Sequence, residues 1–281
     1  MTTVLPQQQQ PAVEQAASVG CPAAVIRALC GRELVRFFRQ RNRVIGALGQ
    51  PLVFWILFAA GLGPSFRMPG QQAGVSYGEY FFPGVVVLII LFTAIFATIS
   101  IIEDRREGFL QSVLVAPIPR WSMVLGKLLG GTLIALVQAL VFLALGLFVG
   151  LKFTVLSVLA ISVFLFILSL ALTGLGFIIA WRMDSTQGFH AIMSVFLMPM
   201  WLLSGAFFPA GAGWLGWVVR LNPLTYGVAG LRRLLYWASA NTLPAELPSA
   251  ATCWIITGLF AAVTLALSWR VAAYRTTGDL L

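Results

Sequence analysis

The sequence predicts an all-α integral membrane protein with six transmembrane helices. Of its 281 residues, 59% are hydrophobic and only 10% are charged, whereas an ordinary soluble domain carries about 25% charged residues. The charges also leave six long intervals without any, and each interval reaches the roughly 20 residues that a helix needs to cross a bilayer. So few charges cannot cover a water-facing surface, which excludes a soluble enzyme.

The charge-free intervals define the predicted spans. The glycine pairs Gly126/Gly130 and Gly146/Gly150 favour close helix packing, although glycine is also simply common in membrane helices. We expect one transmembrane domain over residues 22–275, and no loop is long enough for a separate catalytic domain of about 100 residues. The six spans are expected at 44–63, 81–102, 128–150, 154–181, 191–208 and 251–272.

The N-terminal region before the first span contains two different segments. Residues 1–21 are polar, with a glutamine run, and are predicted to be a disordered cytoplasmic tail. Over residues 22–43, apolar side chains at roughly helical spacing alternate with six arginines, which predicts an amphipathic helix at the membrane surface. The alternative is a basic juxtamembrane tail without special structure. Residues 276–281 form a second short cytoplasmic tail.

The basic residues are distributed unevenly between alternate segments. Thirteen of the 18 Lys and Arg residues lie before the first span, in the second and fourth loops and after the last span. The positive-inside rule makes these segments, and therefore both termini, cytoplasmic. The net charge of +9 is explained by orientation in a membrane, and no nucleic-acid partner is expected.

The sequence offers no catalytic or cofactor-binding constellation. His190 is the only histidine, and the three cysteines lie too far apart in the topology for a metal site or disulfide framework. Gly126-Lys127 is followed by Leu128, where a phosphate-binding loop needs a hydroxyl for magnesium. We therefore expect no cofactor and no metal, and no ATP hydrolysis by this chain itself.

The cytoplasmic segment between the second and third spans has an amphipathic pattern. Charged residues lead into Phe109, Leu110, Val113 and Leu114 at helical spacing, followed by a proline stop. An apolar face with charged flanks suits a partner's groove, and the alternative is a solvated loop that only reverses the chain. The candidate site residues are Glu103, Arg105, Arg106, Glu107, Gly108, Phe109, Leu110, Leu114, Pro117, Pro119 and Arg120.

The outer segment from Pro209 to Pro248 contains two short apolar patches that are rich in Trp and Tyr, and neither patch is long enough to span. We expect two short helices that dip into the outer leaflet or pack on the bundle, with Asn222 as a cap and Pro223 in the first turn of the second helix. A single interfacial helix is the alternative. The candidate residues are Asn222, Pro223, Tyr226 and Arg232.

Two separated motifs resemble those of ABC type-2 permeases, which include drug and polysaccharide exporters. The first is Glu107-Gly108 followed by Leu110, Leu114, Ala116-Pro117-Ile118-Pro119-Arg120 and Leu125-Gly126-Lys127. The second is Ser204-Gly205-Ala206-Phe207-Phe208-Pro209, followed by Leu221-Asn222-Pro223-Leu224-Thr225-Tyr226 and Arg232. The motifs occur in the same order as in the family and on the sides of the membrane expected for it. The resemblance covers roughly residues 22–275.

The resemblance implies the function of the cytoplasmic and outer segments. It makes the helix after Glu103 a coupling helix for a separate ATPase subunit, and the outer segment a re-entrant one. Two permeases, identical or different, and two ATPase subunits would form an exporter of hydrophobic, drug-like, lipid-linked or glycan cargo. Two other classes stay open, namely an ion-coupled secondary transporter and a non-transporting membrane assembly factor. The absence of ionisable groups from the predicted spans weakens the first of these alternatives.

Overall fold

The computed structural model describes residues 21–62, 76–151, 153–207, 213–236 and 247–274, and across these residues it is helical without any strand. The predicted tails at 1–21 and 276–281 lie outside the described residues, apart from Cys21. Six helical segments are long and apolar enough to cross a membrane, as the sequence predicts: Arg41–Leu62, Tyr77–Arg106, Arg120–Phe148, Val155–Trp181, Thr186–Ala206 and Ala250–Ala273.

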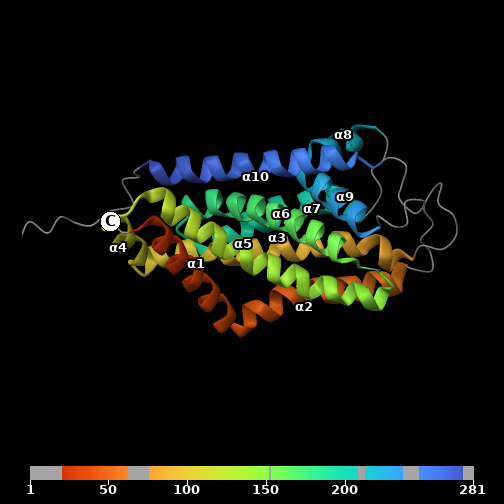
Figure 1. Ribbon diagram of the computed structural model, residues 1–281, viewed down its shortest axis with the longest axis horizontal. Coiled ribbons are helices and arrows are strands. Elements are labelled where there is room, and N and C mark those ends of the chain that lie inside the picture. The colour runs from red at the N-terminus through yellow and green to blue at the C-terminus, as the bar shows by residue number, and fades with distance from the viewer. Residues whose placement is uncertain (1–20, 63–75, 152, 208–212, 237–246, 275–281) are drawn as a thin grey trace, which may run out of the picture.

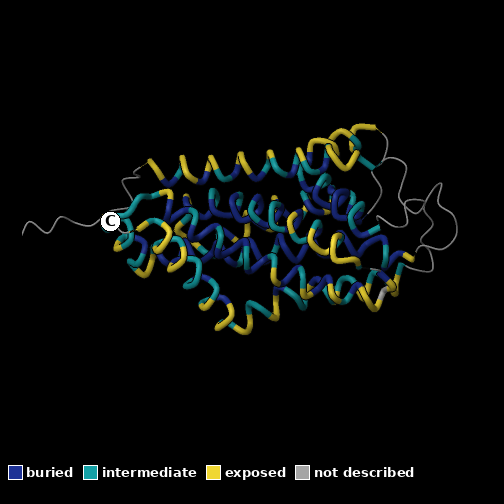
Figure 2. The backbone as a smooth tube through the Cα atoms, in the orientation of Figure 1, coloured by how far each residue is buried: buried dark blue, intermediate teal, exposed yellow. Residues whose placement is uncertain are grey.

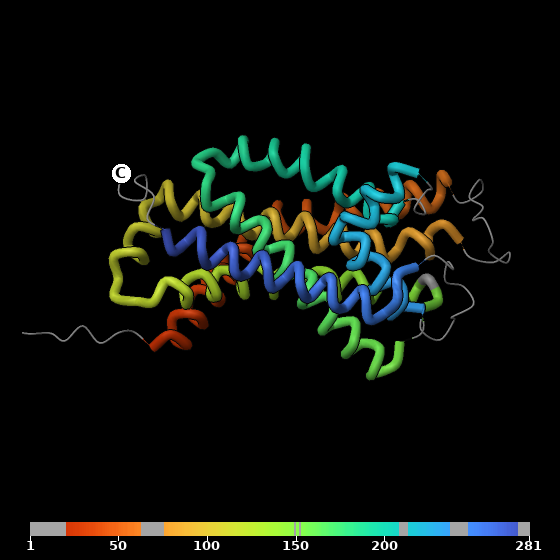
Figure 3. The backbone as a smooth tube through the Cα atoms, turned by 90° about the horizontal axis from the view of Figure 1, so that it is seen from above, coloured from red at the N-terminus to blue at the C-terminus, as the bar shows by residue number. Residues whose placement is uncertain are grey.

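The helices form an elongated bundle around α3 (Figure 1). α3 is buried along most of its length, and Figure 2 shows this dark-blue centre beneath helices with exposed outer faces. In Figure 3, α10 lies across α6 and α7 follows one edge of the bundle. The spanning elements are α2 (Arg41–Leu62), α3 (Tyr77–Arg106), α5 (Arg120–Ala144) continued by η2 (Leu145–Val149), α6 (Val155–Trp181), α7 (Thr186–Trp201) continued by η3 (Leu202–Ala206), and α10 (Ala250–Ala273).

Shorter helices lie at the two ends of the bundle. At one end are α1 (Pro22–Arg39) and α4 (Phe109–Val115), together with the last turn of α10. At the other end are α8 (Trp214–Leu221) and α9 (Pro223–Leu235). The start of α1 and the end of α10 thus share one end of the bundle, which an even number of spans requires.

Several helices extend beyond the predicted spans. α3 continues to Arg106, and α5 begins eight residues before the predicted span, at Arg120. Charges mark where a helix leaves the apolar layer, but they do not end the helix, because Arg, Lys and Glu are good helix formers. The expected amphipathic helix at 22–43 is instead divided at Gln40, so that its last three residues form the first turn of α2.

The packing of α1 on α5 depends on Gly126 and Gly130, one of the two glycine pairs noted in the sequence. A Cβ atom at Gly126 would lie 2.9 Å from the Leu29 Cβ atom, and one at Gly130 would lie 2.7 Å from the Glu33 Cβ atom. Neither distance is sterically possible, so the glycines are what lets the two helices approach this closely. Leu29, Glu33 and Phe37, at i, i+4 and i+8, form the buried face of α1.

Candidate functional site

A left-handed glycine separates α4 from the end of α3. Gly108 has φ of 74° and precedes the first residue of α4, so the helix expected after Glu103 begins only at Phe109. Only glycine adopts this conformation without steric cost. Pro119 is the N-cap of α5. The segment Gly108–Arg120 therefore forms a compact corner between two spanning helices, and Pro117 lies exposed in it.

One side chain of α4 faces the opposite way from the sequence-based expectation. Leu110 is only 1% exposed, because it packs into the core of the same chain. The expectation that Leu110 faces a partner is therefore wrong, and this residue instead anchors α4 to the bundle. Phe109 and Leu114 are half-buried, whereas Val115 is 79% exposed. The free apolar surface of α4 lies at its C-terminal end.

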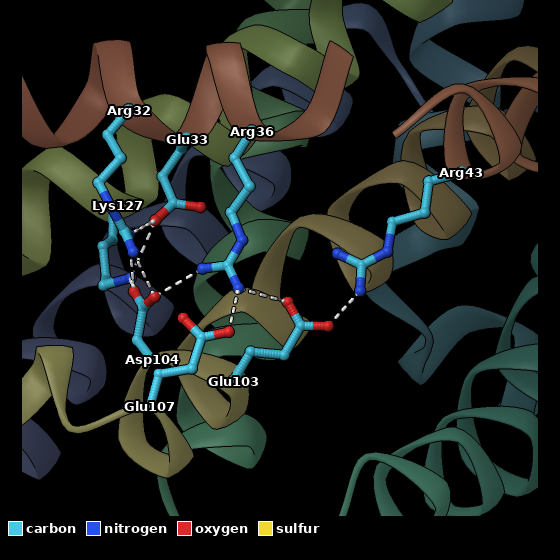
Figure 4. A network of polar contacts seen from close by, with 8 residues as sticks. All are labelled: Arg32, Glu33, Arg36, Arg43, Glu103, Asp104, Glu107 and Lys127. Carbon is cyan, nitrogen blue, oxygen red and sulfur yellow. Dashed lines mark hydrogen bonds and ion pairs between the residues drawn. The ribbon is translucent and has the colours of Figure 1, made fainter. Parts of the chain in front are cut away.

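A cluster of charged residues fixes α1 to the corner (Figure 4). Its centre is Asp104, which is completely buried. The Asp104 carboxylate accepts hydrogen bonds from Arg32 Nη1 and Nη2 at 3.0 and 2.7 Å, and from Arg36 Nη1 at 2.6 Å. Lys127 Nζ donates to the same carboxylate at 2.5 Å. Three helices, α1, α3 and α5, are thereby joined through one side chain.

The rest of the cluster completes the charge balance. Lys127, which is 5% exposed, also donates to Glu33 Oε1 at 2.9 Å. Arg36 Nη2 donates to Glu103 at 2.9 Å and lies 3.4 Å from Glu107 Oε1, while Arg43 reaches the other oxygen of Glu103. Four cations and four carboxylates therefore neutralise one another, as buried charges require.

Arg32 contributes a second contact within the cluster. Its guanidinium lies 3.8 Å from the centroid of the Phe109 ring, a cation–π contact that joins the charges to α4. Its hydrogen bonds to Asp104 raise the pKa of the Arg32 guanidinium above its usual value, despite partial burial. Arg32 therefore stays charged at any accessible pH and holds α4 as well as α3.

Three further arginines from the predicted set attach the corner to neighbouring helices. Arg105 Nη1 donates to Met183 O at 3.2 Å and lies 3.1 Å from Asp184, and Arg106 Nε donates to Asp184 O at 2.9 Å. Arg106 and Glu107 thus turn to different neighbours, Arg106 to Asp184 and Glu107 to Arg36. Arg120 Nη1 donates to the carbonyls of Ala272 and Ala273 at the end of α10, where a cation is favoured.

Sequence reasoning missed the residues that complete the cluster: Arg32, Glu33, Arg36, Arg43, Asp104 and Lys127. One signal was present in the sequence. Glu33 is the one acidic residue among the arginines of 22–43, and its place on the apolar face of α1 indicates a buried partner. Lys127, directly before a charge-free interval, is a second such signal.

The outer segment is organised by Asn222. Its Oδ1 accepts a hydrogen bond from Leu224 N at 3.0 Å, which makes it the N-cap of α9, and Pro223 occupies the first turn as expected. Its Nδ2 donates to Met200 O at 2.5 Å in the fifth span. The Tyr226 hydroxyl donates to Arg220 O at 2.9 Å. Two short helices, α8 and α9, are therefore present, and Asn222 is buried between them and the bundle.

Arg232 secures α9 against the broken end of the fifth span. The side chain is buried, and its Nη2 donates to Tyr80 O at 3.1 Å and to Gly205 O at 3.3 Å. Its guanidinium also lies 4.1 Å from the centroid of the Tyr80 ring. Gly205, at φ of 72°, interrupts the helix, and its carbonyl also accepts a hydrogen bond from the Tyr80 hydroxyl at 3.1 Å. Both donors satisfy that carbonyl, which backbone at membrane depth requires.

Comparison with known proteins identifies the family. The profile of the ABC-2 type transporter family matches residues 24–236, which is more than half of the chain. The chain belongs to this family. The match covers α1, the charged cluster, the α4 corner and α9, so it includes the features described above and confirms the resemblance seen in the sequence motifs.

Individual known proteins show moderate similarity to this chain. The putative transport permease ycf38 of Cyanophora paradoxa is 28% identical over 211 residues, covering 73% of this chain and 72% of that protein. The probable doxorubicin resistance ABC transporter permease protein DrrC of Mycobacterium tuberculosis is 25% identical, and the match covers 72% of this chain and 73% of that protein. The probable multidrug ABC transporter permease YbhR of Escherichia coli is 27% identical, and the match covers 54% of this chain and 42% of that protein.

These findings establish the class of the protein. It is a multi-pass membrane protein, and as an ABC-2 type family member it is the membrane subunit of an ABC transporter. Among the residues that the structure describes, no group of three or more His, Cys, Asp or Glu side chains is placed to hold a metal ion.

Proposed function

We propose that the chain is the permease subunit of an ATP-driven exporter in a bacterial inner membrane, and that a separate ATPase subunit docks on the α4 corner. Family membership carries this proposal, together with the exposed end of α4 beside a rigid charged cluster. Two permeases, identical or different, would combine with two ATPase subunits, and both termini of the permease would be cytoplasmic.

The attachment of the α4 corner to the bundle supports the proposed role in coupling. α4 is only seven residues long and is anchored by the buried Leu110. It joins α3, the buried centre of the bundle, to α5, and the cluster around Asp104 connects both helices to α1. A force that an ATPase applies to α4 would therefore move packed helices together, because such elements shift as units.

The cargo is proposed to be hydrophobic, drug-like, lipid-linked or glycan in nature. Similarity to permeases whose names refer to multidrug transport and doxorubicin resistance supports the drug-like class. The charges described here also support ATP as the energy source. A carboxylate is the usual group that binds a coupling ion, and each of the four carboxylates in the cluster already lies within ion-pair distance of a cation.

Purification of the tagged chain from its native membranes tests the exporter proposal. We expect an ATPase subunit to co-purify, and reconstituted vesicles that contain the complex to hydrolyse ATP and accumulate doxorubicin. Accumulation should continue in the presence of a protonophore, because no ion gradient is used. Accumulation that needs an ion gradient and no ATP would contradict the proposal and favour the secondary-transporter alternative.

The proposed orientation is tested from both ends of the bundle. Arg220→Cys, in a variant without the native cysteines, should react with a membrane-impermeant thiol reagent from outside the cell, because Arg220 is exposed at the α8 end. Asn222 is a poorer probe, since it is buried and caps α9. Alkaline phosphatase fused after Leu281 should be inactive. Labelling of Arg220→Cys only from the cytoplasmic side would reverse the orientation.

A further inference from the structure

The break between α1 and α2 forms an elbow that stands away from the bundle (Figure 1), and Figure 2 shows that much of its surface is exposed. At the elbow, a hollow of about 530 Å³ is lined by five consecutive residues: Arg39, Gln40, Arg41, Asn42 and Arg43. Three arginines and two side-chain amides thus line one hollow that contains no acidic residue. All five side chains can donate hydrogen bonds, which is the chemistry that recognises phosphate.

Two of the three arginines have no counter-ion. Arg43 reaches Glu103, but neither Arg39 nor Arg41 forms an ion pair with any residue in the described part of the chain, and both are exposed. α2 begins at Arg41 without an acidic residue in its first turn, so the positive end of its dipole lies here beside the negative end of α1, which ends at Arg39, and the two unpaired arginines give the elbow its net positive charge. The hollow therefore presents uncompensated positive charge to an anion.

A neighbouring hollow is chemically different. It shares Arg39 and Gln40, but it is also lined by Glu107, which lies 3.4 Å from Arg36. The Glu107 carboxylate repels an anion, and it already forms an ion pair with the Arg36 guanidinium. The hollow formed by residues 39–43 is therefore the better candidate for an anion site.

The surroundings of the elbow indicate that the anion belongs to a lipid. Arg41 is the first residue of a helix that is long and apolar enough to cross a membrane, and only two residues of this helix are buried within the chain. Its first turn consequently lies at the level of the lipid headgroups. Val35 and Phe38 before the break and Ile45 after it are exposed apolar side chains, and they offer contacts to acyl chains beside the arginines.

We propose that the elbow binds the phosphate of an anionic phospholipid through Arg39 and Arg41, with Asn42 and the start of α2 as further donors. The lipid would fix the angle between α1 and α2 at the membrane surface. The inference concerns binding and does not depend on whether the chain is an ATP-driven exporter.

The test uses the purified full-length chain in micelles that contain equal amounts of phosphatidylglycerol and phosphatidylcholine, with bound lipids counted by native mass spectrometry. We expect the wild type to retain phosphatidylglycerol preferentially. Arg39→Gln/Arg41→Gln should reduce this preference roughly thirty-fold, or about five-fold for each arginine near the surface. Arg39→Lys/Arg41→Lys should keep most of it, because the charge remains.

Arg27→Gln/Arg270→Gln is the matched control, since it removes the same charge from two exposed arginines away from the hollow. An equal loss in this control would show general attraction to charge and would overturn the proposal, as would an unchanged preference in Arg39→Gln/Arg41→Gln. Excess inorganic phosphate should not displace the lipid, because it lacks acyl chains. Displacement by inorganic phosphate would identify a site for a free anion and would also overturn the lipid assignment.

Discussion

Asp104→Asn is expected to lower the free energy of unfolding by about 3–5 kcal/mol, the usual cost of removing one partner from a buried ion pair. The substitution keeps the volume but leaves the buried Lys127 and two arginines without their shared carboxylate. The measurement is the free energy of unfolding of the full-length chain in bicelles. Asp184→Asn is the matched control: the Asp184 side chain is 87% exposed and lies 3.1 Å from Arg105, so the loss of its charge should cost less than about 1 kcal/mol.

A second measurement separates undocking of α1 from general unfolding. Cys30 lies half-buried on α1, and burial raises the pKa of its thiol, so it should react slowly with thiol reagents while α1 is docked. In a Cys21→Ser/Cys253→Ser background, Asp104→Asn should accelerate the labelling of Cys30. If Asp104→Asn unfolds like the wild type and Cys30 reacts no faster, the charged cluster does not hold α1 in place.

Val115→Asp is expected to weaken association with the ATPase subunit at least about thirty-fold, or about 2 kcal/mol, which is the scale of a central interface contact. Val115 is 79% exposed on α4, and an aspartate there would be buried without a partner on docking. The measurement is titration of the purified permease with the ATPase subunit that co-purifies with the wild type. Stability of the isolated chain should not change.

Two further substitutions serve as controls for the Val115→Asp result. Val155→Asp makes the same change at a side chain that is 80% exposed at the opposite end of the bundle, so it should leave association intact. Leu110→Asp should destabilise the chain itself, because it places a carboxylate in the core. Undiminished association and undiminished stimulation of ATP hydrolysis in Val115→Asp would show that the end of α4 is not the docking surface.

The membrane-spanning architecture was predictable because it depends only on which residues the bilayer interior accepts. A helix that crosses the bilayer must exclude charges over its apolar length, so the charge-free intervals located all six spanning helices, although α5 begins eight residues before its predicted span. The helix ends were less predictable, since α5 carries Arg120 and Lys127 without losing its helical structure. The cap at Asn222 was predictable because a cap is a local interaction.

The candidate site was predictable only in part, because its main contacts join residues far apart in the chain. Asp104 and Arg32 are separated by 72 residues, and no local pattern reports such a pairing. Leu110 shows a different limit. A seven-residue amphipathic helix has an apolar face, but the sequence does not tell whether that face meets a partner or the chain's own core.

The charged cluster around Asp104 also sets the order in which the protein can be assembled. During synthesis Asp104 follows Arg32 by 72 residues, and Lys127 follows another 23 residues later. Lys127 and the two glycines on which α1 packs all belong to α5. While the first two spans are being inserted, α1 therefore has no complete surface to occupy. α1 must therefore wait at the membrane until the third span has arrived.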